Sequence, residues 1–598
     1  MKIVCLVKQV PHFSAIEFDP ETKSLKREGV PLELNVFCRY AVQHAVAIRE
    51  QVGGEVIAMT MGPPQAEEAL RECLALRADR AIHLSDRVFA LADTLGTSRT
   101  LALALAKEGA DLVLCGRKSL DSETWQVPPE VAAFLGWAHV TNAAALDAFS
   151  GRLQLSRETD FGFEVYEAEP PLVVSVGRAP VTPVSDPKGS DTGSIDVWQA
   201  TDLVDELRES DKRFGQPGSP TRVMAVRDSQ PERNRERIED VDQAANRILE
   251  LLAERKPEPS PWEKPPHAAE IPGAHYDCWT MIELAGKLPR RVSLELLGRG
   301  RALSAKLGGR NIALVFGAPN VAKELARYGA EIVCVVEDEA LADYHPELWG
   351  EALKRVLAQE RPHVLLIPAT GRGRDYGPRA AGELELGMTG DCVGVDIAKA
   401  GRLLQQKPAY GGYITSVILS ATTPQLATIR PRMYEPLEPR DGVDVEVRSL
   451  DVGALPEPRV RRAGGTRDRD SYRIDDADVV SLLGSGLGSP DPIPLIEKGA
   501  AEAGAAIAGT REVCEAGWLP LTRQVGILGR PVAPRLLVAV GVRGDEEEAP
   551  GFVKAGVVAA VDAEDDAPIN EVADVIVPGD WRETLRPLHD RVLAGLRS

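Results

Sequence analysis

The stretch AAIAGTREVCEAGWLPLTRQVGILGRPVAPRLLVAVGVRG (residues 505–544), followed by VVAAVDAEDDAPINEVADVIVPGDW (residues 557–581), decides the fold of the C-terminal region. It contains three strongly apolar runs, Leu536–Val540, Val557–Val561 and Val575–Val577, and each is followed by Gly, Asp or Pro. Runs of this composition are typical of buried parallel strands. Ligands of open α/β sheets bind at the carboxyl ends of such strands, so we expect a ligand edge here.

Short turns near these runs offer groups that suit a phosphate-bearing ligand. The Thr510–Arg511 pair and the turns at 524–526 and 541–544 supply backbone N–H groups, and Arg511 and Arg543 supply positive charge. Backbone N–H groups in such turns bind anions. The pattern predicts a dinucleotide cradle built without a GxGxxG motif. The alternative is that the glycines are ordinary turn residues and the arginines are solvated.

The composition of the whole chain is that of a multidomain globular protein. With 598 residues, 44% of them hydrophobic and 27% charged, we expect three or four domains. The formal net charge of −20 argues against binding to nucleic acid or to anionic membranes. No apolar run is long enough to span a membrane, and the first strand follows Met1-Lys2 directly, which predicts no signal or transit peptide.

The eight cysteines and nine histidines form no metal-binding motif. The cysteines are scattered singly without CxxC pairs, which indicates reduced core thiols in a reducing compartment and no iron–sulfur cluster. The histidines form no HxxxH pattern or cluster, so we expect no metal site. Together with the absence of a membrane span, this predicts a cytoplasmic location.

Strands and helices alternate in two regions, residues 1–186 and 279–440, which predicts two α/β units with parallel sheets. The segment after Ser150 alternates with period two and predicts a hairpin on the first unit. DLVLCGRKSLDSETWQVPPEVAAFLG (111–136) and HVLLIPATGRGRDYGPRAAGELELG (363–387) share a strand, a Gly-Arg turn, an Asp, a Pro and a helix. We interpret this as a degenerate internal repeat, with two units facing each other about a pseudo-dyad. Chance similarity of two Rossmann-like units is the alternative.

Two segments indicate domain boundaries. Residues 256–272 contain six prolines and predict a stiff extended connector. The polar, Arg-rich segment EPRVRRAGGTRDRD (457–470) predicts a flexible hinge. The predicted organisation is a nucleotide-binding domain at 1–255, a linker at 256–275, a second domain at 276–456, a hinge at 457–475 and a ligand-binding domain at 476–598.

Sequence motifs in all three domains are similar to electron-transfer flavoproteins. GTREVCEAGWLPLTRQVG (509–526), LLVAVG (536–541) and DAPI (566–569) resemble the flavin-binding domain of the α subunit. LVKQVP (6–11), LNVFCRYAV (34–42) and LVLCGRKSLDSETWQVPPEVA (112–132) resemble the β subunit, and GRGRDYGPRAAGELELG (371–387), KPAYGGYI (407–414) and ATIRPRMYEP (427–436) resemble domain I of the α subunit. The likeness covers nearly the whole chain in the order β then α, which indicates a fusion of the two subunits. It implies two Rossmann-like units of the adenine nucleotide α-hydrolase-like type and a C-terminal doubly wound domain that binds FAD.

The resemblance implies that Arg511 lies over the isoalloxazine ring, where a fixed cation favours the anionic reduced flavin. The FAD-binding residues that it implies are Ser485, Thr510, Arg511, Gln524, Val525, Gly526, Leu528, Gly541, Val542, Arg543, Gly544, Glu548, Asp562, Asp580 and Trp581. Three departures from the family pattern stand out: an Arg is lost at 481–486, a hydroxyl is lost at Leu528, and the acidic run Asp545–Glu548 replaces a His. Carboxylates oppose an anionic flavin and a pyrophosphate, so we expect FAD with an altered potential or weaker binding, or alternatively a site that has lost its flavin.

The resemblance also implies a second nucleotide site, for AMP or a second FAD, in the N-terminal domain. Its predicted residues are Val7, Lys8, Asn35, Cys38, Met61, Gly62, Asp93, Thr94, Thr97, Gly116, Arg117, Asp121, Thr124, Trp125, Gln126 and Val127. The segment 93–98 opens a helix, so its hydroxyl and N–H groups could cap a pyrophosphate, or it could be a plain capped helix. Trp125 could stack on a ring or fill the core.

These features predict an electron carrier that takes electrons from a flavin dehydrogenase and passes them to a downstream flavoprotein or quinone oxidoreductase, its C-terminal domain swinging on the 457–470 hinge. The loop Val181–Ser194 is polar and lacks the Leu-rich anchor of ordinary β subunits, which makes recognition of a conventional dehydrogenase doubtful. One alternative is an NADH-oxidising, electron-bifurcating flavoprotein with two FAD. Another is a non-redox scaffold that binds adenine nucleotides.

Overall fold

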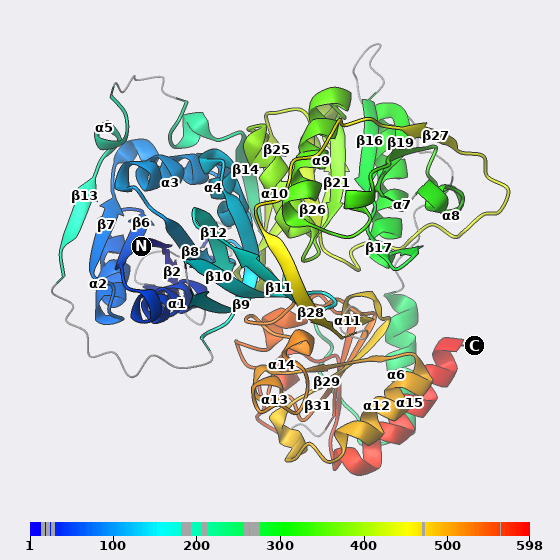
Figure 1. Cartoon of the computed structure of the whole chain (residues 1–598). Helices are drawn as coiled ribbons and strands as arrows, with labels where there is room; N and C mark the ends of the chain where they lie inside the picture. Colours follow the sequence, from blue (N-terminus) through cyan, green and yellow to red (C-terminus); the bar gives the residue numbers. More distant parts are fainter. Residues whose placement is uncertain are drawn as a thin grey trace.

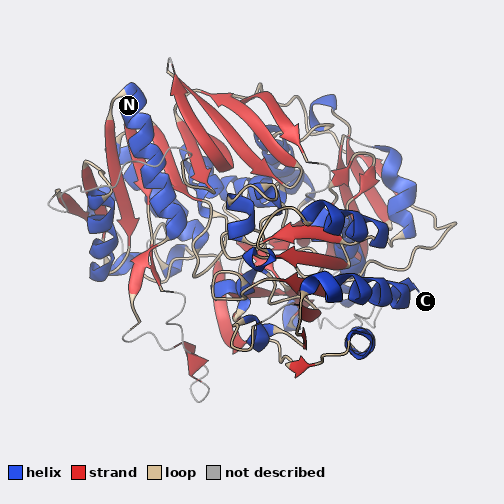
Figure 2. Cartoon of the chain, turned by 90° about the horizontal axis from the view of Figure 1, so that it is seen from below, coloured by secondary structure: helices blue, strands red, loops and turns tan. Residues whose placement is uncertain are grey.

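The computed structural model describes residues 1–12, 18–19, 24–25, 30–149, 151–180, 193–205, 212–255, 262, 276–317, 319–468, 473–561 and 564–597. Within these residues the chain forms three α/β units (Figure 1). The two ends of the chain lie on opposite sides of the molecule, as the view in Figure 2 also shows. The predicted linker at 256–275, apart from Trp262, and positions 181–192 of the predicted loop lie outside the described residues.

The first unit is built on a sheet with the strand order β13-β7-β6-β1-β8-β12-β9-β10-β11-β28. Its own strands are β1 (Lys2–Leu6), β6 (Glu55–Met61), β7 (Arg80–Leu84), β8 (Leu112–Gly116), β9 (Ala138–Phe149), β10 (Arg152–Thr159), β11 (Gly162–Ala168), β12 (Leu172–Val176) and β13 (Ile195–Trp198). Its helices are α1 (Val36–Val52), α2 (Glu67–Ala75), α3 (Thr94–Glu108), α4 (Val127–Leu135) and α5 (Ala200–Leu203). Strands β1, β6, β7, β8 and β12 pair in parallel, and β10 and β11 form the predicted hairpin. The predicted alternation of strands and helices is therefore confirmed.

The second unit is built on a sheet with the order β22-β26-β21-β16-β19-β20-β27. Its strands are β16 (Tyr276–Met281), β19 (Gly308–Phe316), β20 (Ile332–Val336), β21 (Val364–Pro368), β22 (Met388–Cys392), β26 (Gln425–Ile429) and β27 (Glu446–Ser449). Three more, β23 (Gly394–Ile397), β24 (Leu403–Ala409) and β25 (Ile414–Ser420), form an antiparallel sheet. The helices are α7 (Arg291–Leu307), α8 (Ala322–Arg327), α9 (Pro346–Glu360) and α10 (Gly373–Glu383). The predicted Gly-Arg turn is short, because α10 already begins at Gly373.

The internal repeat is confirmed by the topology. Each sheet has seven strands with an equivalent in the other sheet. When these are numbered along the chain within each unit, both sheets have the order 7-3-2-1-4-6-5. Helices α4 and α10, which follow equivalent strands, pack face to face. A Cβ atom added at Gly382 of α10 would lie 2.9 Å from the Cβ of Ala133 on α4. The absence of a side chain at this position therefore allows the two units to approach closely.

Each unit also lends one strand to the other. Strand β14 (Thr221–Asp228) leaves the first unit and pairs antiparallel with β25 of the second unit. Strand β28 (Arg461–Arg467) follows the second unit and pairs antiparallel with β11 of the first unit (Figure 1). Residues 461–467 of the predicted hinge at 457–470 thus form a paired strand. Every residue of β28 is exposed, and backbone hydrogen bonds together with ion pairs of Arg461 with Glu167 and Arg462 with Glu164 hold it against β11. Such a strand has no apolar pattern to reveal it.

The C-terminal domain is a parallel sheet with the order β15-β33-β32-β31-β29-β30. Its strands are β29 (Val479–Leu483), β30 (Ala506–Gly509), β31 (Leu536–Val540), β32 (Val557–Val561) and β33 (Val575–Val577), and its helices are α11 (Arg473–Asp476), α12 (Ile493–Ala503), α13 (Arg511–Glu515), α14 (Ile569–Val572) and α15 (Trp581–Arg597). The three apolar runs form buried strands at the predicted bounds. Apolar clusters cover both faces of the sheet, as predicted for a doubly wound domain.

Residues 236–254 complete the C-terminal domain, although the predicted boundary assigned them to the first domain. Strand β15 (Glu236–Arg237) pairs in parallel with β33. Helix α6 (Val241–Glu254) buries Ile248 and Leu252 in the same cluster as Leu588 and Val592 of α15. The C-terminal domain is therefore built from two separate segments of the chain, one of which lies before residue 255. No helix among the described residues is both long and apolar enough to cross a bilayer.

Candidate functional site

The ligand edge of the C-terminal domain lies between β29 and β31. Numbered along the domain, its five main strands have the order 2-1-3-4-5. The second strand is added on one side of the first and the third strand on the other, so the order of the sheet switches between β29 and β31. Open α/β sheets bind ligands at this switch point. Ser485 follows β29 and Gly541 follows β31, and a Cβ atom at Gly486 would lie 2.8 Å from the Cα atom of Gly541. Glycines are therefore required for the two turns to meet.

The 541–544 turn is an anion-binding turn that already holds a carboxylate. Gly541 and Gly544 have positive φ angles of 60° and 74°. The backbone N–H of Gly544 donates a 2.6 Å hydrogen bond to Oε2 of Glu548, and the backbone of Arg543 also hydrogen-bonds this carboxylate. Burial, followed by the nearby carboxylates of Asp545 and Glu512, raises the pKa of Glu548 to about 7. The Glu548 carboxylate therefore occupies N–H donors of this turn.

Thr510 and Arg511 lie at the start of α13, beside this turn. Oγ1 of Thr510 is buried and has no hydrogen-bond partner among the described residues. The Arg511 guanidinium forms ion pairs with Glu515, at 2.8 Å, and with Glu547, at 3.4 Å. The cation predicted to face a flavin is therefore neutralised by carboxylates from its own helix and from the acidic run.

A pocket of about 180 Å³ lies beside Arg511 and Glu548. Six predicted residues line it: Arg511, Gln524, Val525, Gly526, Leu528 and Glu548. Four acidic residues that the prediction did not include as ligands also line it: Glu512, Glu515, Asp545 and Glu547. Of these four, Glu515 could have been predicted from the sequence, because residues four apart on a helix lie side by side and Glu515 follows Arg511 at that spacing.

The first unit fixes the 521–529 loop of this pocket. Arg178 donates to Oε1 of Gln524 at 2.9 Å and to the carbonyl oxygen of Leu521 at 2.7 Å. Arg117 donates to the carbonyl oxygen of Leu528 at 2.8 Å. The wall of the pocket is therefore held by a unit remote in the sequence.

Of the other nine predicted residues, none of those that the structure describes lines the pocket: Ser485, Thr510 and residues 541–544 lie at the nearby turns and the start of α13, and the remaining three are Asp562, Asp580 and Trp581. Asp580 accepts from the backbone N–H of Arg582 at the start of α15, and Trp581 is a buried member of the core. Asp562 lies outside the described residues.

The predicted residues of the second site gather at the carboxyl edge of the first sheet. Val7 and Lys8 follow β1, Met61 and Gly62 end β6, and Gly116 ends β8. Nζ of Lys8 forms a 2.6 Å ion pair with Asp121. The Asn35 side chain contacts Cys38 and, through hydrogen bonds with the backbone of Lys118 and Leu120, fixes the loop that follows β8.

The start of α3 is already capped by residues of the chain. The Asp93 carboxylate accepts from the N–H of Gly96 at 3.0 Å, and Thr97 continues the first turn. Oγ1 of Thr94 donates to buried Glu130, whose pKa is raised to about 8 by burial and the charge of Asp93. The Asp93 carboxylate already accepts at this helix start and disfavours a pyrophosphate there, which agrees with the alternative of a plain capped helix.

The end of the 116–127 loop contacts the second unit. The Gln126 amide donates to the carbonyl oxygen of Met388 and accepts from the N–H of Gly390, while Val127 begins α4 after Thr124 and Trp125. Trp125 has a positive φ of 63°, and its ring lies beside the guanidinium groups of Arg117 and Arg374.

FAD suits the C-terminal pocket by its donor groups. The switch-point turns, the unpartnered Thr510 hydroxyl and the Arg511 cation offer the hydrogen bonds and charge that a pyrophosphate and an isoalloxazine require. The backbone at 543–544 can bind an anionic group, because it already binds the carboxylate of Glu548. Glu548 must leave this turn if a phosphate is to occupy it.

Comparison with protein families gives the same division of the chain. The family described as "Electron transfer flavoprotein domain" matches residues 22–203 and again residues 278–455. The one described as "Electron transfer flavoprotein FAD-binding domain" matches residues 473–552. The double match of the first agrees with the repeated topology.

Individual relatives match either one part of the chain or the other. Electron transfer flavoprotein subunit alpha of Thermoanaerobacterium thermosaccharolyticum is 32% identical over 326 residues, 53% of this chain and 97% of that protein. Subunit beta of the same organism is 36% identical over 261 residues, 43% of this chain and 99% of that protein. Protein FixB of Bradyrhizobium diazoefficiens is 32% identical over 322 residues, 52% of this chain and 86% of that protein. Two separate subunits of one organism thus correspond to parts of a single polypeptide.

Proposed function

Because this chain belongs to the electron transfer flavoprotein family, with beta-like and alpha-like parts in one polypeptide, we propose that it carries electrons between partner proteins through one FAD in its C-terminal domain. The observation that carries this proposal is the anion-binding turn at the β29/β31 switch point beside Arg511. We propose a flavin dehydrogenase as the donor and a downstream flavoprotein or quinone oxidoreductase as the acceptor. We keep the cytoplasm as the proposed location, which the eight buried free cysteines support.

The residues of the pocket would hold the flavin and set its potential. FAD accepts one or two electrons when bound, and the chemistry is that of the flavin itself. Thr510 and the turns at 484–486 and 541–544 would bind the polar parts of FAD, and Arg511 would supply positive charge. Glu515 and Glu547 oppose that charge, so we propose a flavin whose anionic reduced form is less favoured than an unpaired Arg would make it.

For the second site we propose AMP. The start of α3 is capped by Asp93, so a pyrophosphate there would meet the Asp93 carboxylate. AMP has no pyrophosphate and does not need this helix start. The alternative, a second FAD with electron bifurcation from NADH, requires those groups to rearrange.

The test is the nucleotide content of the purified full chain. We expect a flavin absorption spectrum, and one FAD and one AMP per chain by chromatography of the released nucleotides. Two FAD per chain would contradict the AMP assignment and support bifurcation. Absence of flavin after growth with riboflavin and reconstitution with FAD would overturn the carrier proposal in favour of the scaffold.

A pair of variants tests the position of the flavin. Thr510→Val removes the unpartnered buried hydroxyl, so we expect it to retain less FAD after gel filtration. Thr584→Val is the matched control, because its hydroxyl donates to the backbone of Asp580 outside the pocket. Equal FAD retention by the two variants would contradict the placement of the flavin beside Thr510.

A further inference from the structure

A cavity lies where all three units meet. It encloses about 70 Å³. Its wall contains residues 141–142 and 158–160 of the first unit, 369–371, 430–431 and 433 of the second, and 529–533, 550–551 and 554 of the C-terminal domain. By the same measure a single water needs about 10–15 Å³, so the space is that of roughly five waters or one small polyatomic ion. The cavity shares no lining residue with the pocket beside Arg511.

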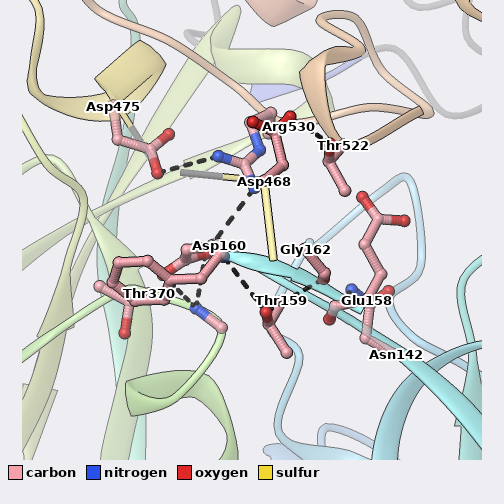
Figure 3. A network of polar contacts seen from close by, with 12 residues as sticks. Asn142, Glu158, Thr159, Asp160, Gly162, Thr370, Asp468, Asp475, Thr522 and Arg530 are labelled. Carbon is pink, nitrogen blue, oxygen red and sulfur yellow. Dashed lines mark hydrogen bonds and ion pairs between the residues drawn. The ribbon is translucent and has the colours of Figure 1, made fainter. Parts of the chain in front are cut away.

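The wall carries more positive than negative charge. Five cationic side chains line it, namely Arg117, Arg374, Arg430, Arg530 and Lys554, against three carboxylates, namely Glu158, Asp160 and Asp475. The carboxylates are already paired: Glu158 with Arg178, Asp160 with Arg290, and Asp475 with Arg530. Figure 3 shows Arg530 between Asp475 and Asp160. Three of the cations are also paired, Arg374 and Arg430 with Asp391 and Arg530 with Asp475. The positive charge that could attract an anion therefore comes from Arg117 and Lys554.

Arg117 is a buried cation of this wall whose charge is not paired with a carboxylate among the described residues. Its side chain is buried, at 4% exposure, and it forms no ion pair with any described carboxylate. Its nearest counter-charge, Glu158, is engaged by Arg178. Its terminal nitrogens donate to Asn142, Leu528 and Gly529, but Nε is buried without a partner among the described residues. A buried charge without a counterion is unfavourable, so this side of the cavity has an unmet requirement for an acceptor.

Two further donors complete the set. Nε1 of Trp125, whose ring lies 5.0 Å from the Arg117 guanidinium, is also buried without a partner among the described residues. Half-buried Lys554 lines the cavity from the C-terminal domain, and its Nζ donates to the carbonyl oxygen of Ser229 at 3.0 Å without a carboxylate partner in the described chain. Donors from two units therefore line one small space.

We propose that this junction cavity binds a small free oxyanion, of the size of inorganic phosphate, through Arg117, Trp125 and Lys554. The cavity shares no lining residue with the flavin pocket, although Arg117 also donates to the carbonyl oxygen of Leu528 in the wall of that pocket. Since three units form its wall, a bound oxyanion stabilises the arrangement in which the C-terminal domain rests on the other two.

Inorganic phosphate is the probe, used on the full chain after dialysis into phosphate-free buffer. At constant ionic strength, phosphate should raise the midpoint of thermal unfolding above its value in chloride, and calorimetric titration should give saturable binding of one phosphate per chain. Lys554→Gln should weaken binding about tenfold, while exposed Lys498→Gln, which changes the net charge equally, should leave it unchanged.

Three results would overturn the proposal. The first is no saturable phosphate binding to the wild-type chain. The second is the same binding constant for Lys554→Gln as for wild type, provided that its unfolding midpoint in chloride shows it to be folded. The third is loss of phosphate binding when AMP is saturating, which would make the cavity the phosphate subsite of a nucleotide. Persistent binding in the presence of AMP supports a separate oxyanion site.

Discussion

The backbone N–H of Gly544 donates a 2.6 Å hydrogen bond to the carboxylate of Glu548, four residues further along the chain. The same turn lies at the edge where an open α/β sheet binds the phosphates of its ligand. The chain therefore carries its own anion in the turn, and an incoming pyrophosphate must compete with it.

FAD affinity should rise as the pH falls through about 7. Burial raises the pKa of Glu548 to about 7, and protonation removes the charge that opposes the pyrophosphate. Above pH 7 we expect Kd to increase by up to about tenfold per pH unit, as uptake of one proton requires. Fluorescence titration of the flavin-free chain with FAD at pH 6, 7 and 8 measures this effect.

Two variants separate Glu548 from the rest of the acidic run. Glu548→Gln should bind FAD more tightly at pH 8 and show a flatter pH dependence. Exposed Glu546→Gln, with the same change in net charge, should keep the wild-type slope. A wild-type Kd that does not vary between pH 6 and 8 would contradict the role of Glu548, as would identical slopes for the two variants.

The reduction potential of the flavin should depend on the charges around Arg511. Arg511→Gln should lower the midpoint potential, and Glu547→Gln should raise it because it frees the Arg511 charge. Both groups are partly exposed, so we expect effects on the order of 1 kcal/mol, about 20 mV for a two-electron couple. Anaerobic redox titration measures the change. Arg582→Gln, at the start of α15, is the control; if it shifts the potential as much as Arg511→Gln, only the net charge matters.

Buried Glu130 should make the free energy of unfolding fall with rising pH. Burial and the Asp93 charge raise its pKa to about 8 in the folded protein, against the ordinary value of 4.5. The folded state therefore binds more protons between these values, and stabilisation present below pH 4.5 is lost as the pH rises to 8. The size is on the order of 4 kcal/mol.

Glu130→Gln should remove this dependence. We expect the free energy of chemical unfolding of Glu130→Gln to lie furthest below that of wild type at pH 5. At pH 9 the difference should be smallest, or Glu130→Gln should be the more stable. The exposed substitution Glu339→Gln should track wild type throughout. A constant difference between Glu130→Gln and wild type at all three pH values would show that Glu130 does not change protonation on unfolding.

Cleavage of the chain between its beta-like and alpha-like parts should leave the protein assembled. Strands β14 and β28 are exchanged between the two units, and α6 is packed in the core of the C-terminal domain. A protease site placed within residues 263–271, once cut, should yield two fragments that co-elute in native gel filtration and separate only in denaturant. Separation in native buffer would contradict the exchange of strands.

The sequence alone was enough for the local elements and the repeat. The runs at 536–540, 557–561 and 575–577 form strands at the predicted bounds, because continuous apolar β-branched runs are stable only between two covered faces. Of the predicted flavin residues, six line one pocket, and Thr510 and the 541–544 turn lie beside it. Motifs at strand ends are predictable because the ends of parallel strands share an edge.

The tertiary structure alone decided how the parts interlock and which charges meet. Strand β28 is exposed along its whole length, and the backbone hydrogen bonds and ion pairs that join it to β11 leave no apolar pattern in the sequence. The contact of Arg117 with Leu528 joins residues 411 positions apart, and nothing local to either residue specifies it. A glycine-rich turn indicates that an anion can bind, but only the folded chain shows that Glu548 reaches it first, because that depends on how the acidic run folds back in space.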